Sequence, residues 1–292
     1  VVSGIVIAMV YDGRMNGLAD WLGFMRKRVA RLYPLHLATL GFYVAIGVLV
    51  WRGTVTPDNP AKYDPDLILP NLAMVHAWSP AGRISFNYVS WSISAETFVY
   101  LTFPVSLWLV KRGFLAGLLA WAATLAAALA VSHALLGEWL VDLNWRLGIL
   151  RAAPSFLLGC WLWEWRDRLA ATALARTLAR HGFLAAGLGF AAAALLWPQP
   201  YLLLALVYAI VVSAFLADLA GRPTWAATPA LADRGHLTYS LYMLHPVVAT
   251  VVISVVFPRL FGRSPGELAA AILVSAALTW IAAGLSYRWF VT

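Results

Sequence analysis

A carboxylate inside an apolar run is the first feature of the sequence that could do chemistry. Glu96 lies in a stretch of apolar residues that ends at Lys111. A carboxylate at bilayer depth costs about 2.5–3.5 kcal/mol on insertion scales, so we expect Glu96 to face a protein interior and to have a partner there. On a helix, Ser92, Glu96 and Tyr100 fall at i, i+4 and i+8 and share one face. This polar stripe is either the centre of a functional site or a structural lock between two helices.

Arg151 is the natural partner of Glu96. It lies about one turn into another apolar run, and the loop pattern places both residues towards the same outer side. Opposite charges at similar depth in one bundle should pair, because either charge alone is costly. The sequence therefore predicts that the Glu96 carboxylate and the Arg151 guanidinium lie within one water molecule of each other.

Arg28 and Arg31 lie at the basic start of a further apolar run. If the helix begins early enough, they are i and i+3 on one face, and such a fork of guanidinium groups suits phosphate oxygens. The neighbouring Arg26 and Lys27 are assigned to topology anchoring, which is the common role of basic residues at cytoplasmic helix ends. His36 follows the pair and is expected near the same, cytoplasmic face.

Three other side chains are weighed between function and structure. His245 lies one to two turns inside a span, where a single histidine is more often an interhelical hydrogen bonder than a catalyst. Trp91 is either part of the Glu96 site or an interfacial aromatic. His76 is expected near the outer interface and receives no role. The sequence contains no HExxH, Cys/His cluster, P-loop or Gly-rich dinucleotide turn, so no metal and no nucleotide-triphosphate chemistry is expected.

The elements that must position these residues are membrane helices. Hydrophobic residues make up 62% of the 292 residues and charged residues 12%, whereas soluble domains average about 25% charged residues. Apolar runs near the roughly 20 residues needed to cross a bilayer predict an all-α, polytopic transmembrane bundle forming a single domain over residues 1–292. It has an N-terminal partial helix and about eight full spans, at residues 33–51, 88–110, 114–136, 147–165, 182–197, 201–219, 238–257 and 267–290.

Orientation follows from the loops. The net charge of +8 reflects basic loops and gives no indication of nucleic-acid binding. Two thirds of the 21 Lys and Arg residues fall on one side of the alternating spans, which the positive-inside rule assigns to the cytoplasm. The long polar segment Arg52–Asn87, with five prolines, is then an outer loop, either without regular structure or with a short interfacial helix at Leu67–Trp78.

In this order, these elements resemble the acyltransferase-3 family of bacterial integral membrane O-acyltransferases. The motifs that carry the resemblance are Arg28-Val29-Ala30-Arg31-Leu32-Tyr33-Pro34, Trp91-Ser92-Ile93-Ser94-Ala95-Glu96, Arg151-Ala152-Ala153-Pro154-Ser155 and Tyr239-Ser240-Leu241-Tyr242-Met243-Leu244-His245-Pro246.

The resemblance implies a ten-helix bundle in the bacterial inner membrane. Such a protein moves an acyl group, usually acetyl, from cytoplasmic acyl-CoA to a hydroxyl of a sugar or lipid-linked glycan, commonly on exported polysaccharide. Acyl-CoA (acetyl-CoA) would be a co-substrate, and no cofactor would be bound permanently. The implied roles divide in two: Arg28, Arg31 and His36 for acyl-CoA, and Trp91, Ser92, Glu96, Arg151 and His245 for catalysis.

Two expectations qualify this reading. The catalytic histidine proposed for the family lies on its first helix, and none of the six histidines here maps to it, so the chain is expected to be an N-terminally truncated and inactive form. The alternative is a non-enzymatic transporter or flippase of polysaccharide units, with Glu96 and Arg151 lining its path. The lack of an internal repeat argues mildly against a transporter built from inverted repeats.

Overall fold

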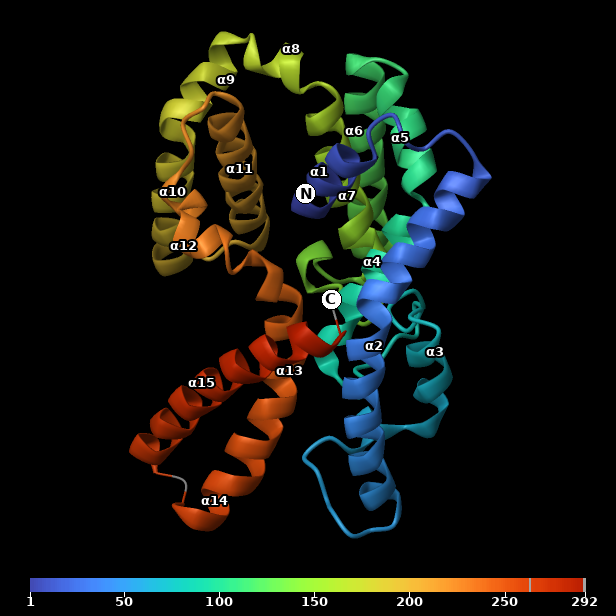
Figure 1. Cartoon of the computed structure of the whole chain (residues 1–292), viewed down its shortest axis with the longest axis vertical. Coiled ribbons are helices and arrows are strands. Elements are labelled where there is room, and N and C mark those ends of the chain that lie inside the picture. Colours follow the sequence, from blue (N-terminus) through green and yellow to red (C-terminus); the bar gives the residue numbers. More distant parts are fainter. Residues whose placement is uncertain (263, 291–292) are drawn as a thin grey trace. The chain divides into compact units, whose positions relative to one another are not determined.

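The computed structural model describes residues 1–262 and 264–290, without the side chains of residues 226, 289 and 290. Within these ranges every regular element is helical and there is no strand, which confirms the all-α prediction. The chain forms two compact units, unit 1 with residues 1–22 and 98–232 and unit 2 with residues 23–97 and 233–292 (Figure 1). The boundary falls inside α4 (Trp91–Leu101), between Thr97 and Phe98. Whether the chain acts as one domain stays a prediction.

Unit 1 consists of apolar helices joined by short turns. They are α1 (Val2–Tyr11), α5 (Phe103–Lys111), α6 (Phe114–Ala130), α7 (Ile149–Glu164), α8 (Arg166–Ala170), α9 (Ala173–Thr177), α10 (Phe183–Leu196), α11 (Pro200–Leu219) and α12 (Pro229–Ala232). Turns of π-helix extend α6 over residues 131–136 and join α9 to α10 over residues 178–182. The helices α10 and α11 pack side by side, as α5, α6 and α7 do (Figure 1).

Two glycines let α1 and α7 touch through their backbones. A Cβ atom at Gly4 would overlap the carbonyl oxygen of Phe156, and one at Gly159 would overlap the carbonyl oxygen of Val1. Close approach of this kind needs small residues, and it is a common way for membrane helices to associate. Glycine at these two positions therefore allows α1 and α7 to cross in close contact.

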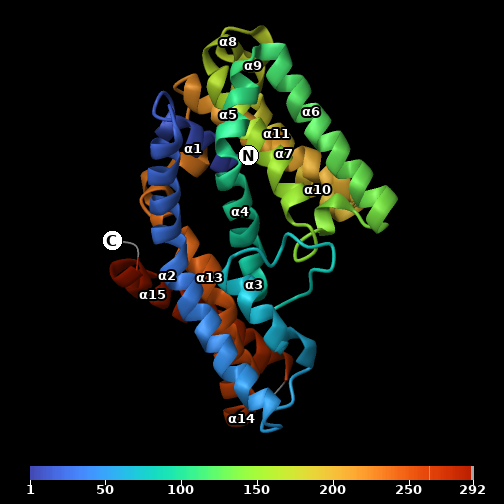
Figure 2. The same ribbon diagram turned by 90° about the vertical axis from the view of Figure 1, so that its right-hand side faces the viewer.

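Unit 2 is built around one long helix, α2 (Leu18–Trp51), most of which lies in this unit. The other helices of unit 2 are α3 (Ile68–Leu72), α13 (Thr238–Ala249), α14 (Phe257–Leu260) and α15 (Pro265–Phe290), and a π-helical turn over residues 250–256 joins α13 to α14. Figure 2 shows α13 beside α15, against which it packs. Tyr43 on α2 reaches the π-helical turn after α13, because its hydroxyl lies 3.1 Å from Thr250 Oγ1.

The polar segment after α2 runs back along that helix. Trp51 Nε1 donates to Tyr63 O (2.7 Å) near the end of α2, and Tyr33 OH donates to Leu72 O (3.0 Å) well before it. Eighteen residues of helix correspond to about 27 Å, so residues 63–72 cover most of the apolar length of α2. The helix predicted at Leu67–Trp78 is shorter in the structure, where α3 covers Ile68–Leu72. Part of the segment, including Tyr63, Asn71 and Phe86, is buried. Its position on the outer side stays a prediction.

The number of membrane spans is smaller than predicted. Among the described residues, six helices are long and apolar enough to cross a membrane: Leu18–Trp51, Phe114–Leu136, Ala173–Leu196, Pro200–Leu219, Pro229–Leu260 and Pro265–Arg288. A seventh is added if Tyr88–Leu101 and Phe103–Lys111, bent by 54°, form one span. The count of about eight is not confirmed, because α7 has only 16 residues, fewer than the roughly 20 that a span needs.

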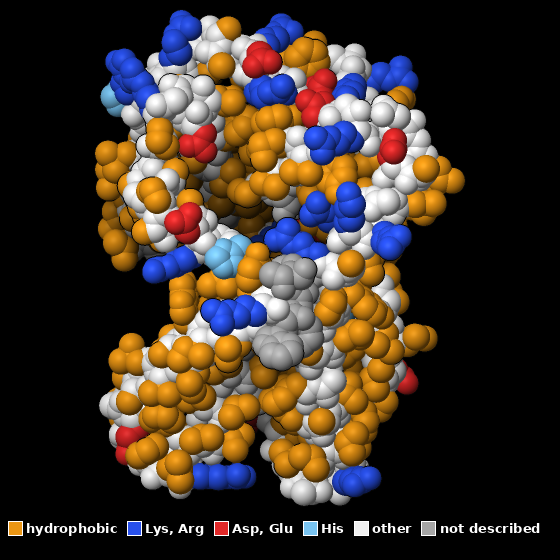
Figure 3. All heavy atoms as spheres, viewed as in Figure 1, with side chains coloured by type: hydrophobic (Ala, Val, Ile, Leu, Met, Phe, Trp, Pro, Cys, Tyr) orange, Lys and Arg blue, Asp and Glu red, His pale blue; other side chains and the backbone are white. Residues whose placement is uncertain are grey.

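The surfaces of the helices agree with a multi-pass membrane protein. Figure 3 shows mostly hydrophobic side chains over α15, whereas Lys and Arg side chains gather around α8 and α9. The large side chains exposed on α15 include Leu273, Ile281 and Leu285. Exposed leucines in such a row are expected where lipid rather than water is the solvent.

Candidate active site

Eight residues have an implied role in catalysis or acyl-CoA binding. Seven of them lie in the same compact unit, although they come from three distant parts of the chain. Unit 2 contains Arg28, Arg31, His36, Trp91, Ser92, Glu96 and His245, whereas Arg151 lies in unit 1. The predicted Glu96–Arg151 pairing joins different units and stays a prediction.

The arginine pair lies on α2, which begins early enough for both residues to be helical and to share a face, as expected. Arg28 is half-buried with its guanidinium carbon 5.4 Å from the centre of the Phe24 ring, and Arg31 is exposed. Arg26 and Lys27 are exposed as well, which suits anchoring. The pair thus combines one guanidinium held against an aromatic ring with one that a ligand can reach.

Tyr239 connects the arginine pair with the carboxylate. Its hydroxyl donates to the carbonyl oxygen of Leu32, the residue after Arg31. The charges of Glu96 and Arg31 both act on this hydroxyl, so the two residues share Tyr239 as a neighbour. Residue types and spacing alone indicate no role for Tyr239. Its place in the fourth motif was the available signal.

The start of α4 positions the polar stripe. Ser92 Oγ donates to Val89 O (3.2 Å) and so serves the first turn of its own helix. Ser94, on another face, is buried and its Oγ accepts from Ala77 N (3.0 Å). Glu96 is half-buried one turn after Ser92. Ser92 therefore supports the helix locally, and Glu96 is the carboxylate of the stripe.

His36 and His76 form the centre of a buried polar network. Their rings lie 6.1 Å apart with planes at 3°. His36 Nε2 donates to Asn71 O (2.8 Å), and the Asn71 amide donates to Ser85 Oγ (2.9 Å). The sequence placed these two histidines near opposite faces, and at least one of those placements is wrong because the segment around α3 packs back against α2. A role of His36 in acyl-CoA binding stays a prediction, although its Nε2 is already occupied by a protein acceptor.

Ser90 fixes the tautomer of His76. Ser90 Oγ donates to Asn87 O (2.7 Å), so it must accept the hydrogen bond from His76 Nε2 (3.0 Å). Burial, and secondarily the neighbouring His36 imidazole, lowers the pKa of His76 to about 3. His76 is therefore neutral at ordinary pH, and its contact with Ser90 supports the turn that starts α4.

The helix α13 holds the same turn, Tyr88–Ser90, by two further contacts. Tyr242 OH donates to Val89 O (3.0 Å), and His245 Nε2 lies 3.3 Å from Tyr88 OH. His245 is thus a half-buried interhelical hydrogen bonder in this structure, which is the structural alternative for a single membrane histidine. Its catalytic role stays a prediction, as does that of Trp91, the half-buried first residue of α4.

Arg151 is held by its own unit. Its Nη1 donates to Val141 O and to Asn144 Oδ1, both at 2.8 Å. One turn later Ser155 Oγ donates to Arg151 O (3.0 Å) and makes a short hydrogen bond to Tyr208 OH on α11. Arg151 therefore belongs to a polar cluster that connects α7 with α11, and Tyr208 is a member that the sequence did not indicate.

No group of three or more His, Cys, Asp and Glu residues that could hold a metal ion is present in residues 1–262 and 264–290. The groups that could take part in a reaction are the guanidinium groups of Arg28 and Arg31, the carboxylate of Glu96 and the phenol of Tyr239. Such a set can bind phosphates and support proton transfer or hydrogen bonding to a hydroxyl.

A helical chain with six or seven membrane-length helices and an internal polar site is a multi-pass membrane protein. A family model described as an acyltransferase domain matches residues 1–286 and so runs through both units. The chain therefore belongs to the acyltransferase-3 family, as the resemblance indicated.

The chain is also similar to Acyltransferase MdmB of Streptomyces mycarofaciens, with 34% identity over 114 residues. The alignment covers 38% of this chain and 27% of that protein, so the chain spans about a quarter of the length of this curated relative. No solved structure matches the chain.

Proposed function

We propose that this protein is a membrane-bound O-acyltransferase that transfers an acyl group, most simply acetyl, from cytoplasmic acyl-CoA to a hydroxyl of a sugar or an exported polysaccharide. The observation that carries the proposal is the match of the acyltransferase family model to residues 1–286, and the contact of Tyr239 with Leu32, the residue after Arg31, supports a site at this end of α2. The bacterial inner membrane, with the basic loops in the cytoplasm, is the location that suits such a donor.

The reaction requires two kinds of support. The acceptor hydroxyl oxygen attacks the thioester carbonyl carbon, the hydroxyl proton passes to a base, and the tetrahedral oxyanion collapses with loss of the CoA thiolate. Arg28 and Arg31 suit the CoA phosphates, since guanidinium groups bind phosphate oxygens through paired hydrogen bonds. Their position on a face of α2 at its basic end supports this role.

Glu96 suits the acceptor hydroxyl. A half-buried carboxylate accepts a hydrogen bond from an alcohol and so orients its oxygen towards the thioester. Because the charges of Glu96 and Arg31 both act on the Tyr239 hydroxyl, we propose that Arg31 helps to balance the negative charge of Glu96. The predicted pairing of Glu96 with Arg151 would complete the charge balance of the site.

The proposal is tested with membranes that contain the full-length protein and its native glycans. Radiolabelled acetyl-CoA is added, and the label is followed into the glycan fraction. We expect label in glycan above that of membranes lacking the protein. Glycan that reaches the outer side without label would contradict the enzyme and favour the transporter or flippase.

A further inference from the structure

A pocket in unit 1 is lined by none of the residues assigned to the candidate active site. It has a volume of about 180 Å³ and lies between the loop after α1 and the last two turns of α5. Its lining includes the polar side chains of Asn16 and Lys111 and the apolar side chains of Pro104, Leu107 and Trp108. The pocket is therefore lined by both polar and apolar side chains.

The charge at the pocket is positive. Lys111 is the charged residue among those that line it. A second cation, Arg112, lies over the ring of Trp108 with its guanidinium carbon 4.1 Å from the ring centre. An anionic ligand would therefore meet one ammonium group inside the pocket and one guanidinium beside it.

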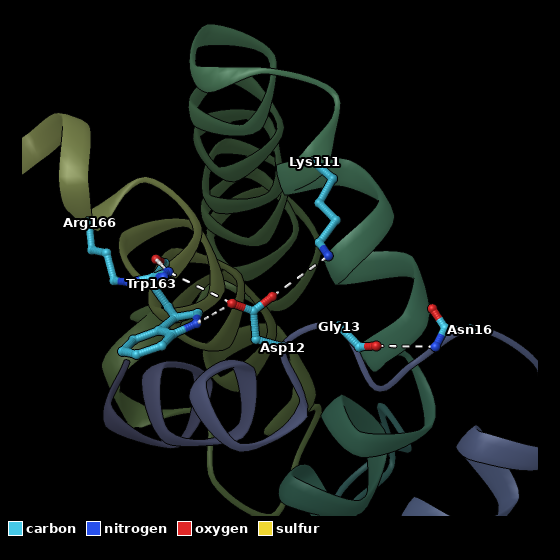
Figure 4. Close-up of polar contacts among 6 residues, drawn as sticks. All are labelled: Asp12, Gly13, Asn16, Lys111, Trp163 and Arg166. Carbon is cyan, nitrogen blue, oxygen red and sulfur yellow. Dashed lines mark hydrogen bonds and ion pairs between the residues drawn. The ribbon is translucent and has the colours of Figure 1, made fainter.

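The nearest carboxylate neutralises Lys111 only in part. Asp12 lies beside the pocket, 3.9 Å from Lys111 Nζ, but it is also 3.9 Å from Arg166 Nη1 and accepts from Trp163 Nε1 at 3.4 Å. Figure 4 shows this single carboxylate between the two cations. One negative charge shared by two positive ones leaves the group cationic. The C-terminal ends of α1 and α5 carry about half a negative charge each and together offset this excess, so the remaining positive charge at the pocket is that of Arg112.

The loop presents an amide to the same pocket. Asn16 Nδ2 donates to Gly13 O (3.1 Å), and the backbone N–H of Asn16 donates to Asp20 Oδ2 (2.9 Å) (Figure 4). Gly13 adopts a φ of 69°, which a glycine reaches without strain. These contacts fix the turn, so Asn16 is held at the edge of the pocket before any ligand arrives.

The residues at the pocket are of the kind found at the level of lipid headgroups. Pro104 to Lys111 correspond to about 10 Å of helix at the basic end of a possible span. Trp108 is 55% exposed and Val105, on the outer side of the same helix, is 57% exposed. Exposed Trp and Lys side chains at a helix end are typical of the membrane interface, where phosphate and glycerol groups lie.

We propose that this pocket binds the phosphate group of an anionic phospholipid, with Lys111 and Asn16 at the phosphate and Leu107 and Trp108 against the glycerol region. The site is independent of the proposed acyl transfer. The alternative is general anchoring, in which Lys111, Arg112 and Trp108 contact any membrane surface without a discrete site.

The test uses the full chain in nanodiscs, with lipid binding measured by native mass spectrometry at increasing fractions of phosphatidylglycerol in phosphatidylcholine. We expect the wild-type protein to retain one phosphatidylglycerol. Lys111→Gln should lower its affinity about fivefold, which is the effect of one basic residue at an anionic surface. Asn16→Trp fills the pocket from an exposed loop position without changing any charge, and it should abolish retention of phosphatidylglycerol.

The matched control is Arg14→Gln, which removes an exposed cation from the same loop outside the pocket and should change the affinity less than twofold. An equal loss in Arg14→Gln and Lys111→Gln would overturn the proposal in favour of diffuse attraction, and so would wild-type retention by Asn16→Trp. Displacement of the lipid by inorganic phosphate or by acetyl-CoA at similar concentration would also overturn it, because the site would then belong to a soluble phosphate compound.

Discussion

Different interactions stabilise the interior of unit 1 and the interior of unit 2. Thirteen of the fifteen buried polar residues among those described lie in unit 2, and only Ser132 and Ser213 lie in unit 1. Unit 1 relies on shape: glycines at helix crossings and edge-to-face aromatic contacts such as Phe103 with Phe156, whose ring centres lie 5.9 Å apart. Unit 2 relies on hydrogen bonds among side chains and the irregular backbone of residues 60–90.

The difference follows from what each unit must bury. Regular helices satisfy their own backbone groups, so unit 1 packs largely by van der Waals contact, to which hydrogen bonds such as that between Ser155 and Tyr208 are added. The segment after α2 is largely irregular, and its buried N–H and C=O groups need partners. Side chains such as His36, Asn71 and Ser94 supply them. The polar interior that results is also where the candidate chemical groups gather.

The comparison depends most on Glu96. In the complete protein, Glu96→Gln should lower acyl transfer about 10³-fold, the range expected for loss of a group that acts on a proton in the transition state. Transfer of radiolabelled acetyl to glycan measures the effect, and immunoblotting of the membranes confirms insertion. Wild-type transfer would reduce Glu96 to a structural lock.

A change of shape in unit 1 should act on stability. Gly159→Val places a side chain where α1 and α7 touch and should lower the free energy of unfolding by about 3 kcal/mol. Thermal unfolding of the purified protein in detergent measures the loss. Gly187→Val on α10 is the control, because a Cβ atom there meets nothing within 4 Å. Equal effects of the two substitutions would refute the importance of the crossing.

Acid should destabilise unit 2 through His76. The unfolded chain binds a proton at this imidazole below pH 6.5, whereas the folded chain keeps it neutral down to about pH 3. Stability is therefore fully present above pH 6.5 and falls as the pH decreases, by about 2 kcal/mol at pH 5. Melting temperatures at pH 7.5 and pH 5 should differ more for the wild type than for His76→Gln. An identical difference in both would show that His76 is not the acid-sensitive group.

The smallest expected effect concerns the arginine pair. Arg31→Ala should raise KM for acyl-CoA about tenfold with little change in kcat, because an exposed guanidinium contributes binding that substrate and transition state share. Initial rates over a range of acetyl-CoA concentrations give both constants. Arg26→Ala, an exposed neighbour, should leave KM unchanged. A similar rise in both variants would point to general surface charge.

Much of the candidate site could be predicted from residue types and spacing. Arg28 and Arg31 share a face because helical geometry puts i and i+3 together, and Ser92 and Glu96 follow from the same rule. The stacking of His36 on His76 and the position of Tyr239 could not be predicted. These contacts join segments far apart in the chain, and no periodicity describes an irregular segment that packs against a helix.

The sequence by itself determined that this chain is a helical membrane protein, because a bilayer demands long apolar helices and their composition shows directly. It also determined the family, because the motifs of the family can be found in the sequence without any knowledge of contacts. Only the tertiary structure decided that residues 63–72 pack along α2 and that Asp12 lies between two cations. The physical reason is that hydropathy responds to the solvent around a segment, whereas the partners of a polar group depend on which other segments fold against it.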